Sequence, residues 1–156
     1  MEFALHLIVL VAVMHLLQTQ HHDGGLTIVL LQTQHHDGGL TIVLGHAGGT
    51  YAQQAASLAT PLDILVATPQ KLLQHAEKGN VYYGDVQYVV LDEADTMFDR
   101  GFGPEVEKVL GPLRSKPEPA HCILVAATLT KVGPMLAATC LHLHACIVMP
   151  VLVQCW

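Results

Sequence analysis

The sequence predicts an α/β fold in which a mostly parallel sheet carries flanking helices. Three apolar runs, at 62–68, 86–95 and 122–128, have the composition of strands that are buried on both faces. Two segments with helical signals separate these runs, and this alternation is typical of an open sheet with right-handed crossovers. Ligand sites in such sheets lie at the carboxyl ends of the strands. The 156 residues suffice for one domain with a core.

Each predicted helix begins at a proline. Thr68 is suited to cap the first helix, with Pro69 at its first position. The second helix is predicted from Pro104, with Glu105 and Glu107 in its first turn, where negative charge stabilises the helix dipole. Both helices lie between predicted strands, as crossover connections require.

The composition limits the classes of function. The chain is 51% hydrophobic and 13% charged, and its 7 basic and 13 acidic residues give a net charge of −6. That balance argues against a dedicated basic nucleic-acid binder, although backbone amides are still able to grip a phosphate chain. The four cysteines form no C-x-x-C pair, so we expect reduced thiols and an intracellular protein.

The first 44 residues contain an apolar leader and a perfect repeat. Residues 3–17 are apolar, which fits a buried strand or helix, a signal or membrane segment, or a non-native leader. The sequence of Leu16–Leu30 recurs without change at Leu30–Leu44. Each copy predicts an Asp-Gly turn followed by an LTIVL strand. Two identical copies indicate a recent duplication or a gene-assembly error, so one strand has no evolved partner.

Two His-containing patterns suggest metal sites, and the spacing argues against both. Adjacent histidines in the two His-His-Asp clusters point to opposite faces of an extended chain. In the apolar tail, a single strand would spread the four candidate ligands over about 20 Å, whereas a zinc ion holds its ligands within about 2.3 Å. These tail residues are Cys140, His142, His144 and Cys146.

An acidic cluster closes the second predicted strand. Asp92 and Glu93 directly follow the apolar residues 88–91. Mg²⁺ prefers oxygen ligands and keeps several waters, so one carboxylate beside it is enough. A second carboxylate can orient or deprotonate an attacking water. The pair fits nucleotide hydrolysis, and on spacing alone it fits a solvated acidic loop equally well.

The stretch VLDEAD at Val90–Asp95 resembles motif II of the DEAD-box ATP-dependent RNA helicases letter for letter, and a family-like TMFDRGF follows it. Three segments agree in order and spacing. GGT at 48–50 is similar to the family's glycine pair, ATPQKLL at 67–73 to its TPGRL-type segment, and AATLT at 126–130 to its SAT motif. The resemblance covers residues 45–131 and implies an incomplete first RecA-like domain.

The resemblance implies a role for individual residues. Asp92 would hold Mg²⁺ through water, and Glu93 would serve the attacking water. Asp95, Ala126 and Thr128 would couple the nucleotide site to bound RNA through the SAT-like segment. The positions implied to lie along the RNA backbone are Gly48, Gly49, Thr68, Pro69 and Lys71. ATP and Mg²⁺ are the implied cofactors, and RNA is the implied partner.

Departures from the family pattern concern the phosphate side of the site. The chain contains no Gly-Lys dipeptide, so the G-x-x-x-x-G-K-[ST] loop is missing. Ala126 replaces the serine of the SAT motif, and Lys71 replaces an arginine, which keeps the charge but loses the bidentate fork. The second RecA-like domain, with its arginine finger, is not among these residues. We therefore expect a truncated relative that is catalytically inactive in isolation.

Two alternatives stand beside this reading: a module that binds RNA backbone or a helicase partner, and a non-functional gene fragment. We predict a leader unlike the family at 1–44, a partial helicase ATP-binding domain at 45–131 and an apolar tail unlike the family at 132–156. The exposed apolar ends predict a protein partner and no membrane. The missing phosphate-loop strand predicts an unpaired sheet edge, which either duplicated strand is suited to fill.

Overall fold

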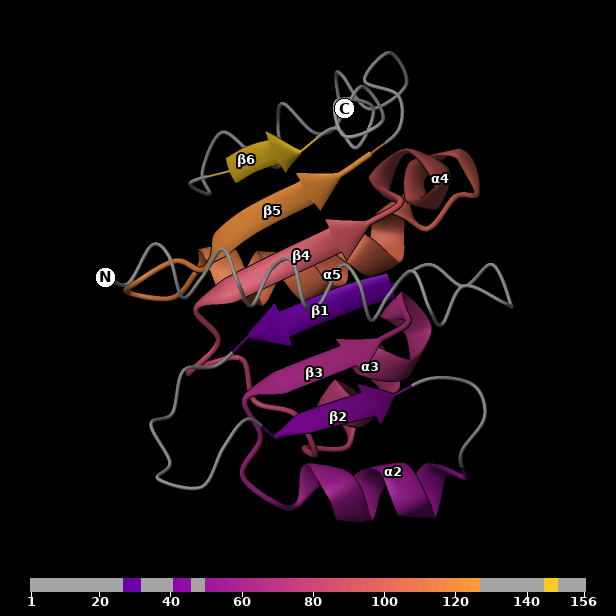
Figure 1. Ribbon diagram of the computed structural model, residues 1–156, viewed down its shortest axis with the longest axis vertical. Helices are drawn as coiled ribbons and strands as arrows, with labels where there is room; N and C mark the ends of the chain where they lie inside the picture. Colours follow the sequence, from indigo (N-terminus) through magenta and orange to yellow (C-terminus); the bar gives the residue numbers. More distant parts are fainter. Residues whose placement is uncertain (1–26, 32–40, 46–49, 127–144, 149–156) are drawn as a thin grey trace, which may run out of the picture.

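The computed structural model describes residues 27–31, 41–45, 50–126 and 145–148. Within these residues six strands form one sheet in the order β2-β3-β1-β4-β5-β6 (Figure 1). The strands are β1 Thr27–Leu31, β2 Ile42–Gly45, β3 Ile64–Ala67, β4 Tyr88–Asp92, β5 His121–Val125 and β6 Ala145–Val148. The described helices are α2 Tyr51–Leu58, α3 Pro69–Glu77, α4 Ala94–Asp99 and α5 Gly103–Arg114. The predicted α/β class is confirmed.

β1 runs against every other strand in the described part of the sheet. The pairs β2–β3, β4–β5 and β5–β6 are parallel, whereas β1 pairs antiparallel with both of its neighbours, β3 and β4. Because β1 is antiparallel to both, β3 and β4 point the same way. Five strands therefore end at one edge of the sheet, which we call the carboxyl edge, while β1 ends at the opposite, amino edge (Figure 1).

The two copies of the repeat take different places in this sheet. The first copy supplies β1, which lies between β3 and β4, and the second supplies the outer strand β2. Ile28 in β1 is 0% exposed, but its counterpart Ile42 in β2 is 39% exposed. Both predicted strands are confirmed. We expected either copy to fill an unpaired edge of the sheet. This expectation was wrong for the first copy, because β1 lies between β3 and β4. The Asp-Gly turns, both His-His-Asp clusters and residues 3–17 lie outside the described residues.

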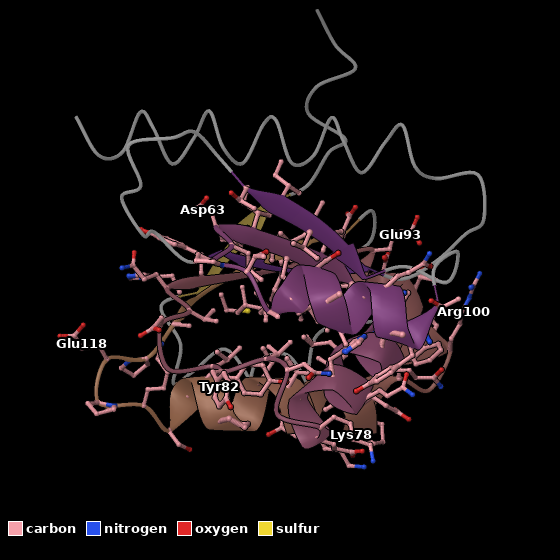
Figure 2. The ribbon with its side chains drawn as sticks, turned by 90° about the horizontal axis from the view of Figure 1, so that it is seen from below. Asp63, Lys78, Tyr82, Glu93, Arg100 and Glu118 are labelled. Carbon is pink, nitrogen blue, oxygen red and sulfur yellow. The ribbon has the colours of Figure 1, made fainter. Side chains whose placement is uncertain are left out.

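Apolar side chains cover both faces of the sheet. Along β4, Val89 and Leu91 belong to the larger core cluster, while Val90 belongs to a smaller cluster on the other face. The larger cluster includes the buried face of α5, and Figure 2 shows α2, α3 and α5 together on one side of the sheet. The continuous apolar strands of the sequence therefore match a sheet that is buried on both faces.

Helices α3 and α5 confirm the two predicted helices, with three local corrections. Thr68 is the N-cap of α3, but its side chain makes no capping hydrogen bond. Glu107 lies beyond the first turn of α5 and pairs with Arg114. The strand predicted over 86–95 is shorter than expected: β4 covers Tyr88–Asp92, and the chain then turns into α4. Helix α2, which the sequence analysis did not predict, begins with a capping box between Thr50 and Gln53.

Candidate functional site

The carboxyl edge gathers the described residues that were predicted to form the site. β3 and β4 are in register across β1, so Thr68, directly after β3, lies at the same level as Asp92, the last residue of β4. β5 runs parallel beside β4 and is followed by Ala126, which is 3% exposed. Three segments that are distant in sequence thus meet at one edge, as expected for a ligand site in this class of sheet. The predicted residues Gly48, Gly49 and Thr128 lie outside the described residues.

The turn from β4 into α4 fixes the two adjacent carboxylates. Glu93 has a φ of 51°, in the left-handed region, and its backbone N–H donates to Oδ1 of Asp92 at 2.9 Å. Its carbonyl accepts from the backbone N–H of Met97 at 2.9 Å, which begins α4. A non-glycine residue held in this region costs about 1–3 kcal/mol and persists only where its surroundings fix it. Asp92 and Glu93, both half-buried, are therefore held together by the backbone.

Asp95 lies in the first turn of α4 and is nearly buried, with 8% of its surface exposed. Its Oδ1 accepts a hydrogen bond from the backbone N–H of Thr96 at 3.0 Å. A carboxylate at this position is favourable to the helix dipole. Its predicted coupling to residues 126–130 stays a prediction, because only Ala126 of that segment is described.

The carboxylate side of the site fits Mg²⁺. Asp92 and Glu93 offer oxygen donors on a fixed turn at the end of a strand. The described residues contain no group of three or more His, Cys, Asp or Glu side chains able to hold a metal ion. Mg²⁺ needs no such cage, because it is held by one or two carboxylates together with water and substrate phosphates. A bound Mg²⁺ would neutralise phosphate charge beside these two residues.

β1 is not placed to carry a phosphate loop to these carboxylates. A phosphate loop that followed β1 would have to leave this strand at the carboxyl edge to reach Asp92. The register of β1 pairs Thr27 with Asp92 and Leu31 with Tyr88. Its carboxyl end therefore lies at the amino edge, one strand length away from the carboxylates. A strand of five residues spans about 17 Å, which is too far for hydrogen bonds from the residue after Leu31 to a phosphate beside Asp92.

The amino-terminal end of α3 also lies at the carboxyl edge. The carbonyl of Thr68 accepts from the backbone N–H of Leu72 at 3.0 Å, so the helix begins there, and Pro69 is buried. The first-turn N–H groups of a helix have no acceptors within it and favour anions. Lys71 is half-buried in the same turn, and its Nζ donates to Oε1 of Gln74 at 3.4 Å. This end of α3 combines amides, a hydroxyl and a cation.

A polar network that the sequence analysis missed joins α2 to α3. His75 is 2% exposed, and its Nε2 lies 3.1 Å from Oε1 of Gln54, which is 5% exposed. Nδ2 of Asn80 lies 3.2 Å from Nδ1 of His75 and donates to the hydroxyl of Tyr51 at 2.8 Å. The Tyr51 and His75 rings stack with centroids 4.7 Å apart. These partners are up to 29 residues apart in sequence, so no local pattern reveals them.

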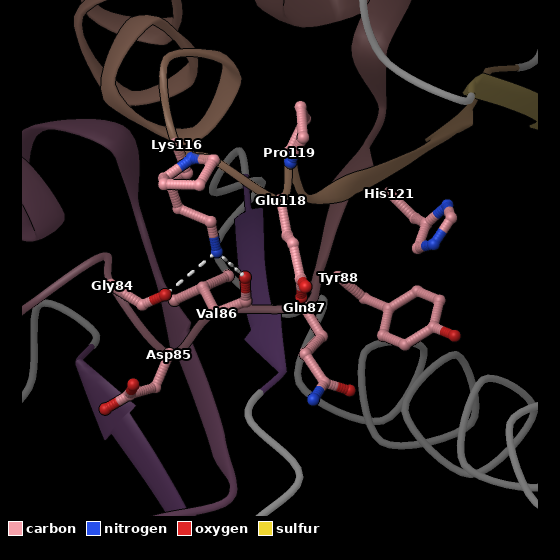
Figure 3. Close-up of a pocket in the computed structure, with 10 residues that line it drawn as sticks. Gly84, Asp85, Val86, Gln87, Tyr88, Lys116, Glu118, Pro119 and His121 are labelled. Atoms are coloured by element: carbon pink, nitrogen blue, oxygen red, sulfur yellow. Dashed lines mark hydrogen bonds between the residues drawn. The ribbon is translucent and has the colours of Figure 1, made fainter.

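A cavity of about 590 Å³ lies at the amino edge (Figure 3). Residues 84–88, 116–119 and His121 line it, and the rings of Tyr88 and His121 stack with centroids 5.1 Å apart. Lys116 directs its amino group to the backbone carbonyls of Gly84 and Val86. Figure 2 places Glu118, from this lining, and Glu93 at opposite ends of the sheet. The cavity is therefore separate from the predicted site.

No helix in the described ranges is both long enough and apolar enough to span a bilayer.

A family model described as DEAD/DEAH box helicase matches residues 7–134, which include both copies of the repeat. DEAD-box ATP-dependent RNA helicase 39 of Arabidopsis thaliana is 49% identical over 88 residues, covering 53% of this chain and 14% of that protein. ATP-dependent RNA helicase DeaD of Mycobacterium tuberculosis is 34% identical over 97 residues, covering 62% of this chain and 17% of that protein. The chain thus spans less than a fifth of the length of these relatives.

Two solved structures share the fold. A DEAD box protein from the hyperthermophile Methanococcus jannaschii superimposes with a TM-score of 0.60 at 27% identity, over 72% of this chain and 30% of that one. The yeast DEAD-box splicing factor Prp28 superimposes with a TM-score of 0.57 at 30% identity, over 64% of this chain and 22% of that one. The similarity extends to the arrangement of strands and helices and supports the RecA-like fold.

Proposed function

Because the chain belongs to the DEAD/DEAH box helicase family, we propose that it is a partial first RecA-like domain that keeps an RNA-backbone surface but does not hydrolyse ATP in isolation. The missing phosphate-loop sequence carries this proposal, and the direction of β1 agrees with it. The antiparallel strand next to β4 ends at the amino edge, and no Gly-Lys dipeptide exists to form a phosphate loop elsewhere in the sequence. In this proposal Asp92 would hold Mg²⁺ and Glu93 would serve the attacking water, while the groups that would bind the phosphates are missing.

The RNA surface in this proposal is the amino-terminal end of α3. Phosphate contacts come from helix N-termini, hydroxyls and cations, and Thr68 and Lys71 supply these groups at one end of one helix. The net charge of −6 favours a local contact of this kind over a broad basic face. The binding is therefore expected to be weak and independent of sequence. RNA-backbone binding is the function that this geometry supports best.

We expect the 156-residue chain to release phosphate from ATP no faster with RNA than without it. The physical reason is that the chain has no phosphate loop to bind ATP, so Glu93 has no bound nucleotide on which to act. A phosphate-release assay with single-stranded RNA, ATP and Mg²⁺ measures this, with Glu93→Gln as the matched variant. RNA-stimulated turnover that disappears in Glu93→Gln would contradict the proposal, whereas equal background rates support it.

We expect Lys71→Gln to weaken binding of single-stranded RNA several-fold. Removing one phosphate contact lowers the slope of log K against log salt by about 0.7. Fluorescence anisotropy with a labelled oligonucleotide between about 50 and 200 mM salt measures both quantities. Lys78→Gln is the matched control, because Lys78 is exposed and caps the opposite end of the same helix. Equal losses of RNA affinity in the two variants, or the absence of salt-sensitive binding by the wild type, would contradict the proposed RNA surface.

A further inference from the structure

The contacts of His75 assign its tautomer. The amide nitrogen of Asn80 is only a donor, so the Nδ1 that faces it at 3.2 Å accepts. The ring proton therefore sits on Nε2 and is donated to Oε1 of Gln54 at 3.1 Å. Both nitrogens of a neutral ring are thus satisfied in a buried site, and the stacked ring of Tyr51 covers one face. The donors and acceptors of this arrangement match a neutral His75.

The surroundings of the ring favour this neutral form. Burial, and secondly the positive charge of Lys71, lower the pKa of His75 below its ordinary value of 6.5. The titratable groups shown to contact the ring or act on it are Tyr51 from α2 and Lys71 from α3; Gln54 and Asn80 are uncharged. Lys71 precedes His75 by four residues, so the two lie on the same face of α3. A movement of α3 at His75 is therefore transmitted to the turn that carries Lys71.

We propose that the network of Tyr51, Gln54, His75 and Asn80 positions the amino-terminal end of α3 for RNA phosphate, and that protonation of His75 releases it. The proposal rests on the RNA surface proposed above. The capping box fixes the start of α2, since Thr50 Oγ1 accepts from the backbone N–H of Gln53 at 3.3 Å. The network then ties this helix to α3. It acts through position only, because none of its four residues lies in the first turn of α3.

Protonation of His75 forces this arrangement to change. A proton taken from solvent onto Nδ1 places two donors, the imidazolium N–H and the Asn80 amide, against each other. Asn80 must then turn its amide so that its oxygen accepts from the imidazolium, and the Tyr51 hydroxyl must change from acceptor to donor. The buried imidazolium also pays a desolvation cost, and Lys71 repels it. The link between α2 and α3 is therefore weaker at acidic pH.

The test compares RNA affinity across three variants of the full chain. His75→Ala removes both hydrogen bonds, and we expect RNA binding to weaken at least about 5-fold at pH 7.5, the lower range of a typical coupling. His75→Gln can still donate to Gln54 and accept from Asn80, so its affinity should stay close to that of the wild type. Leu113→Ala, at the far end of α5 and fully buried, is the control for lost stability alone. It should keep its affinity at a temperature where it remains folded.

The pH profile separates a positioning role from a merely structural one. From pH 7.5 down to the lowest pH at which both proteins remain folded, wild-type affinity should fall relative to that of His75→Gln, which has no imidazole to protonate. Parallel profiles for these two proteins, or His75→Ala binding as tightly as the wild type, overturn the inference and leave the RNA surface standing. Absence of salt-sensitive binding by the wild type overturns both. Weakened binding by Leu113→Ala to the same extent as by His75→Ala also overturns the inference.

Discussion

Replacing Ile28 with alanine is expected to lower the free energy of unfolding by about 2–5 kcal/mol. The same substitution at Ile42, in an identical stretch of sequence, is expected to cost about 1 kcal/mol or less. The reason is position alone. Ile28 is 0% exposed in the central strand, and Ile42 is 39% exposed in the outer one. Urea denaturation of the two variants and the wild type measures the difference directly.

The comparison is sharp because the two sites share their neighbours in sequence. Propensity, turn chemistry and local charge are the same in both copies, so they cancel. Equal losses of stability in the two variants would contradict the arrangement in which the first copy is central. A larger loss for Ile42→Ala would reverse the assignment of the copies to β1 and β2.

Local patterns predicted much of the fold for identifiable reasons. The runs that became β3, β4 and β5 are apolar at nearly every position, which only a strand covered on both faces requires. Proline at the start marked α3 and α5. Helix α2 was missed although its capping box was visible at Thr50 and Gln53. Its first two turns are rich in Ala, Gln and Ser, which give no clear apolar stripe.

The direction of β1 could not be predicted from the sequence. TIVL occurs in both copies, yet one copy pairs antiparallel and the other parallel. The direction of a strand is set by its connections and by the neighbouring strands, and a four-residue sequence determines neither. The residues of the site also divide into those that a local sequence pattern predicts and those that it does not. Asp92 and Glu93 were predicted because their chemistry lies in adjacent residues, whereas the contacts of His75 come from the packing of two helices.

The direction of β1 links the fold to the proposed loss of ATPase activity. If β1 ran parallel to β4, as β5 does, it would end next to Asp92, where a following loop could approach bound phosphates. The antiparallel copy completes the sheet and buries Val29 and Leu30, which are 0% and 1% exposed, but it ends at the amino edge. In the proposed function, the duplicated segment completes a core without supplying a nucleotide site. In this proposal the stability of the fold is separable from catalytic activity, because stability needs only buried apolar area in the strand between β3 and β4.

Deleting one 14-residue copy is expected to abolish cooperative folding. Removal of residues 17–30 or of residues 31–44 gives the same protein, because the copies are identical. One remaining TIVL stretch cannot be both β1 and β2. The side chains of Ile28, Val29 and Leu30 are at most 1% exposed, and burial of each contributes about 1.5–3 kcal/mol. Their loss approaches the whole stability of a typical domain, about 5–15 kcal/mol.

Circular dichroism during urea and thermal unfolding measures this outcome. The deletion variant should show no cooperative transition, while Ile42→Ala, which keeps both strands, should unfold cooperatively near the wild-type midpoint. A deletion variant as stable as the wild type would mean that one copy fills the centre and that the outer strand β2 is dispensable.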